Sequence, residues 1–233
     1  MDLHRSRFLT GAAALTAGAM LPVRASATVQ DDPDHAAVGT AIDALSRLRA
    51  GNARFTRFKG RKPIHPPFQR PYGRDQAPFV SLITCADSRV GPEVVFDQGL
   101  DQLFVCRIAG NIAPPEITGS IEYAVAHFHT PLVVVLGHSA CGACNATITS
   151  LDSGKLPDAS IASVVAAILP AARRFPTGDL GKRRAQVVRE NARLTAANLR
   201  MSPIVRGNAE VVYGVHDLVS GWVTFYEAAR AQG

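Results

Sequence analysis

Two long apolar runs constrain the fold of this chain more than any other feature. "FVSLITC" (79–85) and "PLVVVLGH" (131–138) carry hydrophobic residues at nearly every position, without the alternation of a half-exposed strand. Such runs are typical of parallel strands that are buried on both faces. A segment with helical spacing, "IEYAVAHF" (121–128), precedes the second run. The alternation predicts an α/β fold with a mainly parallel β-sheet flanked by helices.

The rest of the core extends this pattern. We expect a further strand over 102–109 and helices from Cys141 onward, over 159–175 and over 182–201. Residues 209–225 predict a strand, a turn at Ser220-Gly221 and a short returning strand.

The region before the core reads differently. Residues 39–58 carry Ile42, Leu45, Leu48 and Phe55 at helical spacing, interrupted by Gly51-Asn52, which predicts one or two amphipathic helices. The proline-rich segment 59–78 predicts an extended connector.

The first 27 residues have the three-part layout of a secretory signal peptide. Arg5 and Arg7 form a basic start, Phe8 to Leu21 form a short apolar run, and Ala25-Ser26-Ala27 is a small-x-small cleavage motif. We therefore expect cleavage after Ala27 and a periplasmic or secreted protein, without stable membrane insertion. The segment resembles a twin-arginine signal in degenerate form, because Ser6 separates the two arginines. The alternative is an unprocessed tail.

The distribution of the basic residues along the chain argues against a nucleic-acid partner. The formal net charge is +6, but the basic residues are scattered and no aromatic-interleaved stripe or reading motif accompanies them. We interpret them as solvated helix faces.

Chemistry-bearing residues follow the two apolar runs. The first run ends in Cys85, and Asp87 and Arg89 follow at once; the second ends in His138, with Cys141 three residues later. Binding sites of open parallel sheets form outside the carboxyl ends of the strands. Two thiolates and one imidazole are a zinc ligand set with a fourth position open, as in catalytic zinc sites. Taken singly, each residue also has a purely structural explanation. Cys85 could be a core thiol, His138 could bond to the backbone, and Asp87 and Arg89 could form an ion pair at a helix start.

A rival interpretation concerns "CGAC" (141–144). Cys-x-x-Cys at the start of a helix resembles the motif of thiol–disulfide oxidoreductases, where the helix N-terminus lowers a thiol pKa. That function would leave Cys85, Asp87, Arg89 and His138 without a role. We therefore interpret Cys144 and Cys106 as core residues.

"CADSRV" (85–90) and "GHSACGA" (137–143) together resemble the β-class carbonic anhydrases. The similarity runs from about residue 40 to the end and includes "ALSRLRAGNARF", "FDQGLDQLFVCRIAGNI", "GSIEYAVAHF", "ENARL" and "GVHDLVSGWV". Cys106 and His216 depart from the residues usual at their positions. Together with the signal peptide expected at 1–27, which lies outside the similarity, we expect a linker and N-terminal helical arm at 28–63 and a zinc-binding catalytic α/β domain at 64–233.

The resemblance also implies an activity, the reversible hydration of CO₂ to bicarbonate and a proton with one Zn²⁺ per chain. Cys85, His138 and Cys141 would hold the ion, and Asp87, oriented by Arg89, would act on the attacking water. In a closed form, Asp87 itself would occupy the fourth metal position. Gln98 and Gly142 would contact the substrate, and a homodimer or homotetramer is expected. Hydrolysis of COS or CS₂ on the same fold and a catalytically idle bicarbonate sensor are the alternatives.

Overall fold

The computed structural model describes residues 38–58 and 76–226. The expected signal peptide, most of the connector and the expected domain boundary at residue 64 lie outside these ranges, so those expectations remain predictions. Among the described helices, none is long and apolar enough to cross a membrane.

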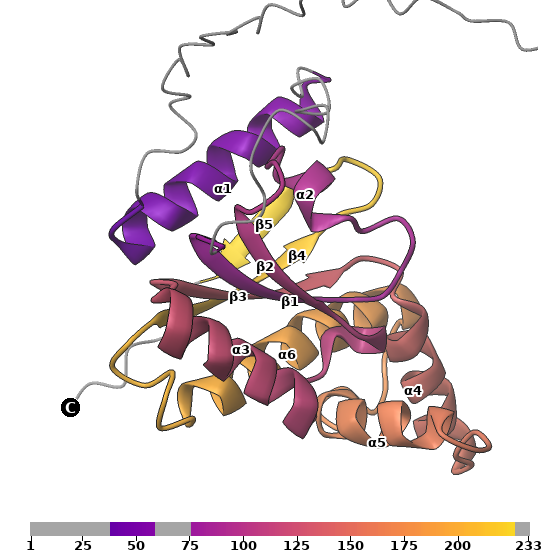
Figure 1. Cartoon of the computed structure of the whole chain (residues 1–233). Coiled ribbons are helices and arrows are strands. Elements are labelled where there is room, and N and C mark those ends of the chain that lie inside the picture. Colours follow the sequence, from indigo (N-terminus) through magenta and orange to yellow (C-terminus); the bar gives the residue numbers. More distant parts are fainter. Residues whose placement is uncertain (1–37, 59–75, 227–233) are drawn as a thin grey trace, which may run out of the picture. The chain divides into compact units, whose positions relative to one another are not determined.

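Five strands form a mixed sheet in the order β2-β1-β3-β4-β5 (Figure 1). The first four pair in parallel, and β5 runs antiparallel to β4. The expectation of a mainly parallel sheet with a short returning strand is therefore confirmed. The strands are β1 (Val80–Thr84), β2 (Leu103–Arg107), β3 (Leu132–His138), β4 (Glu210–His216) and β5 (Val223–Tyr226).

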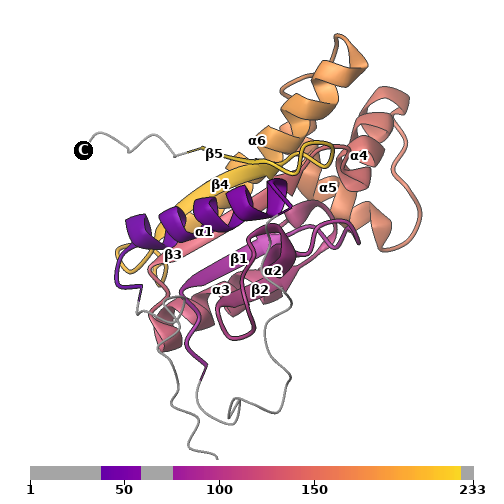
Figure 2. The same cartoon turned by 90° about the horizontal axis from the view of Figure 1, so that it is seen from above.

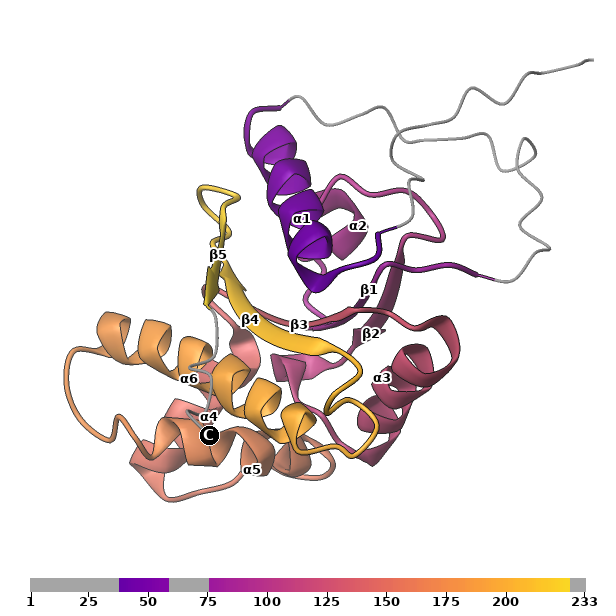
Figure 3. The same ribbon diagram turned by 90° about the vertical axis from the view of Figure 1, so that its left-hand side faces the viewer.

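Helices cover both faces of the sheet (Figure 3). On one face lie α1 (Ala41–Thr56) and the short α2 (Pro92–Val95). On the other lie α3 (Pro115–Phe128), α4 (Gly142–Ser153), α5 (Ile161–Ala172) and α6 (Leu180–Arg200). All of these except α2 were expected from the sequence. Their bounds differ by a few residues, except that α3 begins at Pro115, six residues before the expected start at Ile121.

Neighbouring residues of the central strands face opposite cores. Leu82 and Val134 pack with residues of α1, whereas Ile83 and Val135 pack with residues of α3 and α6. Because successive side chains of a strand point to opposite faces, a strand covered on both sides must be apolar at every position. This explains the uninterrupted runs in the sequence.

Helix α1 is one continuous helix that crosses over β3 (Figure 2), so Gly51-Asn52 does not interrupt it. A Cβ on Gly51 would lie 1.7 Å from the Phe96 carbonyl oxygen, so glycine permits the close approach of α1 and the end of α2. The buried Asn52 amide donates to the carbonyls of Val95 (3.1 Å) and Gly221 (2.9 Å). The pair that suggested a break is therefore the contact that docks the helix.

Candidate metal centre

Three metal-ligating side chains meet at one edge of the sheet. Cys85 directly follows β1, His138 is the last residue of β3, and Cys141 immediately precedes α4. Because β1 and β3 are parallel neighbours, their carboxyl ends lie side by side. The two sulfur atoms and one imidazole nitrogen all lie within 4.8 Å of one another, and all three residues are buried. This group could hold a metal ion.

The His138 ring has one bonded and one free nitrogen. Its Nδ1 lies 2.9 Å from the Ser139 carbonyl oxygen, which requires the proton to sit on Nδ1. Nε2 is fully buried and makes no hydrogen bond with any described residue. Buried polar atoms are rarely left without a partner, and metal-bound histidines commonly donate their other N–H to a backbone carbonyl. The orientation of His138 therefore fits a metal ligand.

A glycine supports the thiol of Cys85. The Gly110 amide donates to Cys85 Sγ at 3.3 Å, and Asn191 fixes the same glycine by donating to its carbonyl oxygen at 2.7 Å. Gly110 has φ +71°, and a Cβ there would lie 2.5 Å from Cδ1 of Ile168. A residue with a side chain would therefore be strained in conformation and sterically excluded.

The two thiols of the group hold their protons tightly when no cation is present. The neighbouring Cys141 and burial raise the pKa of Cys85 to about 12. The neighbouring Cys144 and burial raise the pKa of Cys141 to about 11. Two thiolates at this spacing need a compensating cation, and a divalent metal ion with an affinity for sulfur supplies that charge.

Asp87 and Arg89 form a two-pronged ion pair beside the group. Arg89 donates from Nε to Asp87 Oδ1 at 2.9 Å and from Nη2 to Oδ2 at 2.7 Å. These bonds hold the pKa of the Asp87 carboxyl well below its usual range. Oδ2 of Asp87 also lies 3.9 Å from Nε2 of His138. All five residues that the sequence places at the strand ends are therefore close together.

Arg107, on the edge strand β2, is a site residue that sequence reasoning missed. It donates to the Cys85 carbonyl oxygen at 3.3 Å and to the Asp87 carbonyl oxygen at 2.7 Å. These bonds hold the loop that carries Cys85, Asp87 and Arg89. The sequence signal for this role was an arginine at the end of an apolar strand. Its hydrogen-bond partners, however, lie in the loop after β1, and the sequence does not show that β2 pairs with β1.

His216 is a second imidazole close to His138, since the two residues pair in register between β3 and β4. It is buried, and neither ring nitrogen has a hydrogen-bond partner among the described residues. Burial and the nearby His138 lower the pKa of His216, so the ring is neutral at pH 7.

The two predicted substrate-binding residues lie in different settings. Gln98 is buried; its amide donates to the Phe96 carbonyl oxygen (2.7 Å) and accepts from Arg47 Nε (3.1 Å). Those bonds tie it to the region around α1 and α2. Gly142 is the exposed first residue of α4, and no side chain caps this helix start. Substrate contact by either residue remains a prediction.

All four cysteines are buried and free. Cys106 packs in the core between the sheet and helices α3 and α6, away from the Cys85–His138–Cys141 group. Cys144 packs beside Cys141 but is not part of the ligand group. The first cysteine of the Cys-x-x-Cys motif thus has a place in the metal group.

Comparisons with known proteins agree with this geometry. Residues 80–224 match the family model described as "Carbonic anhydrase". The carbonic anhydrase of Mycolicibacterium smegmatis is 41% identical over 134 residues, which cover 56% of this chain and 64% of that protein. Carbonic anhydrase 2 of Mycobacterium tuberculosis is 40% identical over 131 residues, covering 56% and 63%. The chain thus spans less than two thirds of the length of both relatives.

The fold also resembles solved structures. One of two tetrameric β-carbonic anhydrases from the fungus Sordaria macrospora superposes with a TM-score of 0.60 at 24% identity, covering 67% of this chain and 84% of that one.

Proposed function

This chain belongs to the β-class carbonic anhydrase family, and we propose that it catalyses the reversible hydration of CO₂ to bicarbonate and a proton. One observation carries the proposal: the ionised Asp87 carboxylate, clamped by Arg89, lies 3.9 Å from the unbonded Nε2 of a buried Cys₂His group. A carboxylate in this position can accept a hydrogen bond from a water molecule at the open side of the ligand group.

We propose zinc as the metal, with one ion per chain held by Cys85, His138 and Cys141. Two thiolates and one imidazole are donors that zinc prefers, and three protein ligands leave a fourth position open. When bound, zinc supplies Lewis acidity that lowers the pKa of a water molecule from about 15.7 to about 7, so that a nucleophile exists at neutral pH.

The side chains of the chain then have separate tasks. The Ser139 carbonyl keeps the Nδ1–H tautomer of His138, so that the Nε2 lone pair faces the ligand group. Asp87 accepts a hydrogen bond from the attacking water. This bond orients the water so that a lone pair of the water oxygen faces the CO₂ carbon. Arg89 keeps Asp87 ionised and holds it back from the open metal position. The backbone N–H of Gly142, in the first turn of α4, can donate to a bicarbonate oxygen.

We also propose that the chain assembles into a homodimer or homotetramer and that residues 1–27 direct its export and are removed in the process. The tetrameric β-carbonic anhydrases of Sordaria macrospora support assembly into an oligomer. The layout of the first 27 residues supports export. Light scattering on the purified protein tests the assembly, and a monomeric mass would contradict it.

Stopped-flow CO₂ hydration on the zinc-loaded protein, with Cys85→Ser as the control, tests the activity. We expect rapid hydration by the wild type and nearly none by the control. COS and CS₂, offered in parallel, test the alternative hydrolase. Wild-type CO₂ hydration no faster than that of Cys85→Ser would refute the proposed function.

A further inference from the structure

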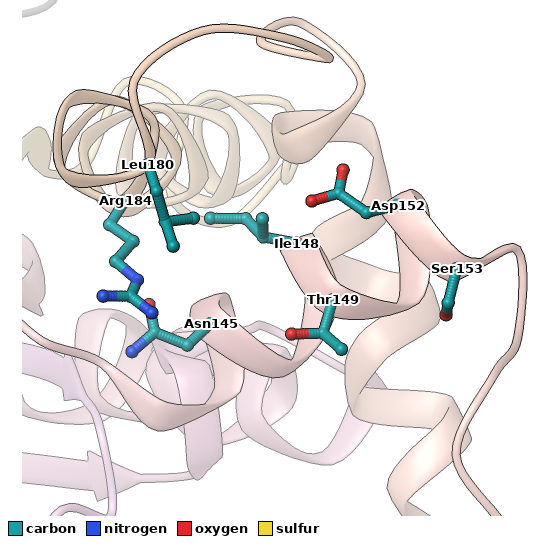
Figure 4. A pocket seen from close by; sticks show the side chains of 7 residues that line it. All are labelled: Asn145, Ile148, Thr149, Asp152, Ser153, Leu180 and Arg184. Atoms are coloured by element: carbon teal, nitrogen blue, oxygen red, sulfur yellow. The ribbon is translucent and has the colours of Figure 1, made fainter.

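A hollow of about 330 Å³ lies between α4 and the first turns of α6 (Figure 4). None of its lining residues belongs to the Cys85–His138–Cys141 group. Its volume is at the lower end of the range of small-molecule pockets, about 300–1,000 Å³. It is therefore large enough for an organic molecule of modest size.

Among the residues that the structure describes, the charged groups around this hollow leave one cation, Arg184, without a partner. Asp152, an acidic residue of the lining, is occupied by Arg183, which donates from Nη1 to Oδ2 at 3.0 Å and from Nη2 to Oδ1 at 2.7 Å. Arg184, next in the chain, also lines the hollow, but it forms no hydrogen bond or ion pair with any described residue. The hollow therefore favours an anion, and the planar guanidinium of Arg184 matches a carboxylate.

Asn145 provides an unused acceptor near this cation. Its Oδ1 is shielded from solvent and accepts no hydrogen bond from the described residues. Figure 4 shows the Asn145 amide and the Arg184 guanidinium at the same end of the hollow. A buried acceptor without a donor is costly, so a ligand that brings an O–H to this oxygen gains more than one that does not.

Two aliphatic side chains form the apolar part of the lining. The side chains of Ile148 and Leu180 point toward each other across the hollow (Figure 4). Ile148 is buried, but Leu180 remains 45% exposed at the start of α6. A branched alkyl group placed between them would remove apolar surface of Leu180 from water.

We propose that this hollow is a binding site for a small 2-hydroxycarboxylate with an apolar side chain. The carboxylate pairs with Arg184, and the alkyl group packs between Ile148 and Leu180. The amide of Asn145, which lines the hollow, turns over when the ligand enters, so that the adjacent hydroxyl of the ligand donates to Oδ1. The site is separate from the metal group, and the inference does not depend on the proposed catalytic function.

Titration calorimetry on the full, zinc-loaded chain tests the proposal with three related probes. These are 2-hydroxy-4-methylpentanoate, 4-methylpentanoate, which lacks the hydroxyl, and 2-hydroxy-4-methylpentanamide, which lacks the charge. We expect one saturable site per chain that binds the first probe at least about tenfold more tightly than either analogue. Absence of saturable binding up to the solubility of the first probe, or equal affinity for all three, would overturn the proposal.

Matched variants locate the site. Arg184→Gln should weaken binding of the hydroxy acid at least about tenfold. Lys182→Gln, an exposed cation of the same helix that does not line the hollow, should leave it unchanged. Asn145→Leu should abolish the preference for the hydroxylated probe. Equal weakening by Lys182→Gln and Arg184→Gln would reveal non-specific charge attraction and refute the site.

Discussion

Arg89 holds the Asp87 carboxylate in a planar fork, with Nε 2.9 Å from Oδ1 and Nη2 2.7 Å from Oδ2. Asp87 follows Cys85 by two residues, and its Oδ2 is 3.9 Å from Nε2 of His138. The carboxylate is thus close enough to the proposed metal to compete for it if Arg89 released it.

Removing that fork should therefore inactivate the enzyme without removing the metal. For Arg89→Ala we expect full zinc occupancy and a fall in CO₂ turnover of at least about a hundredfold, roughly 2.7 kcal/mol, because the freed Asp87 occupies the open position. Asp87→Ala should also be slow, but it should still bind small anions, which Arg89→Ala should not. Arg89→Lys keeps the positive charge but loses the two-pronged geometry, so its CO₂ turnover should lie between those of the wild type and Arg89→Ala. Near wild-type turnover by Arg89→Ala would rule out this role of the pair.

The ligand assignment predicts different zinc contents for four cysteine variants. Cys106→Ala and Cys144→Ser should keep about one zinc per chain, because neither sulfur belongs to the Cys₂His group. Cys85→Ala should lose the metal or most of the activity, and Cys141→Ser should lose zinc. Elemental analysis of the purified variants measures this. Zinc loss from Cys144→Ser together with retention by Cys141→Ser would reverse the assignment.

Two glycine-to-alanine changes should shift stability in opposite directions. Gly51→Ala would place a Cβ 1.7 Å from the Phe96 carbonyl oxygen, so we expect a loss of about 1–3 kcal/mol as α1 is forced away. Gly119 lies inside α3, where an added Cβ meets nothing within 4 Å. Gly119→Ala should therefore stabilise by about 0.5–1 kcal/mol. Urea unfolding compares both with the wild type, and equal effects would contradict the docking role of Gly51.

Glu190 should make part of the stability depend on pH. Arg193 donates to its two oxygens at 2.8 and 2.7 Å, and this pairing lowers the pKa of Glu190 from its ordinary 4.5. A depressed carboxyl pKa contributes stability that is present above the unfolded pKa and is lost as the pH falls through the folded one. Glu190→Gln should thus lower the free energy of unfolding by about 2 kcal/mol at neutral pH. This difference between the variant and the wild type should shrink below pH 4.5.

Urea midpoints at neutral and acidic pH test this dependence. Asp158→Asn, a change at an exposed position, is the control and should behave as the wild type. A difference for Glu190→Gln that stays constant down to acidic pH would show that the ion pair is not its source.

Export predicts a chain that begins at Thr28. Intact-mass measurement on protein from its native host should give the mass of residues 28–233, because the signal peptide is removed on translocation. Recovery of the full-length chain from the cytoplasm would contradict the export proposal.

The residue pattern alone was sufficient for the class of fold and for the proposed ligands. A strand covered on both faces must be apolar throughout, so β1 and β3 could be recognised from composition over a few residues. Their ends are where parallel sheets build sites, so Cys85 and His138 could be paired without knowing the structure.

Tertiary structure decided the contacts between segments that are distant in the chain. Gly51-Asn52 reads as a helix break in isolation, but α1 continues there because Phe96 and Val95 approach closely. Arg107 supports the Cys85 loop only because β2 pairs with β1. The hollow at Asn145 and Arg184 exists because α4 packs near α6. Local periodicity reports which side of an element is buried, whereas the partner that buries it depends on the packing of whole surfaces.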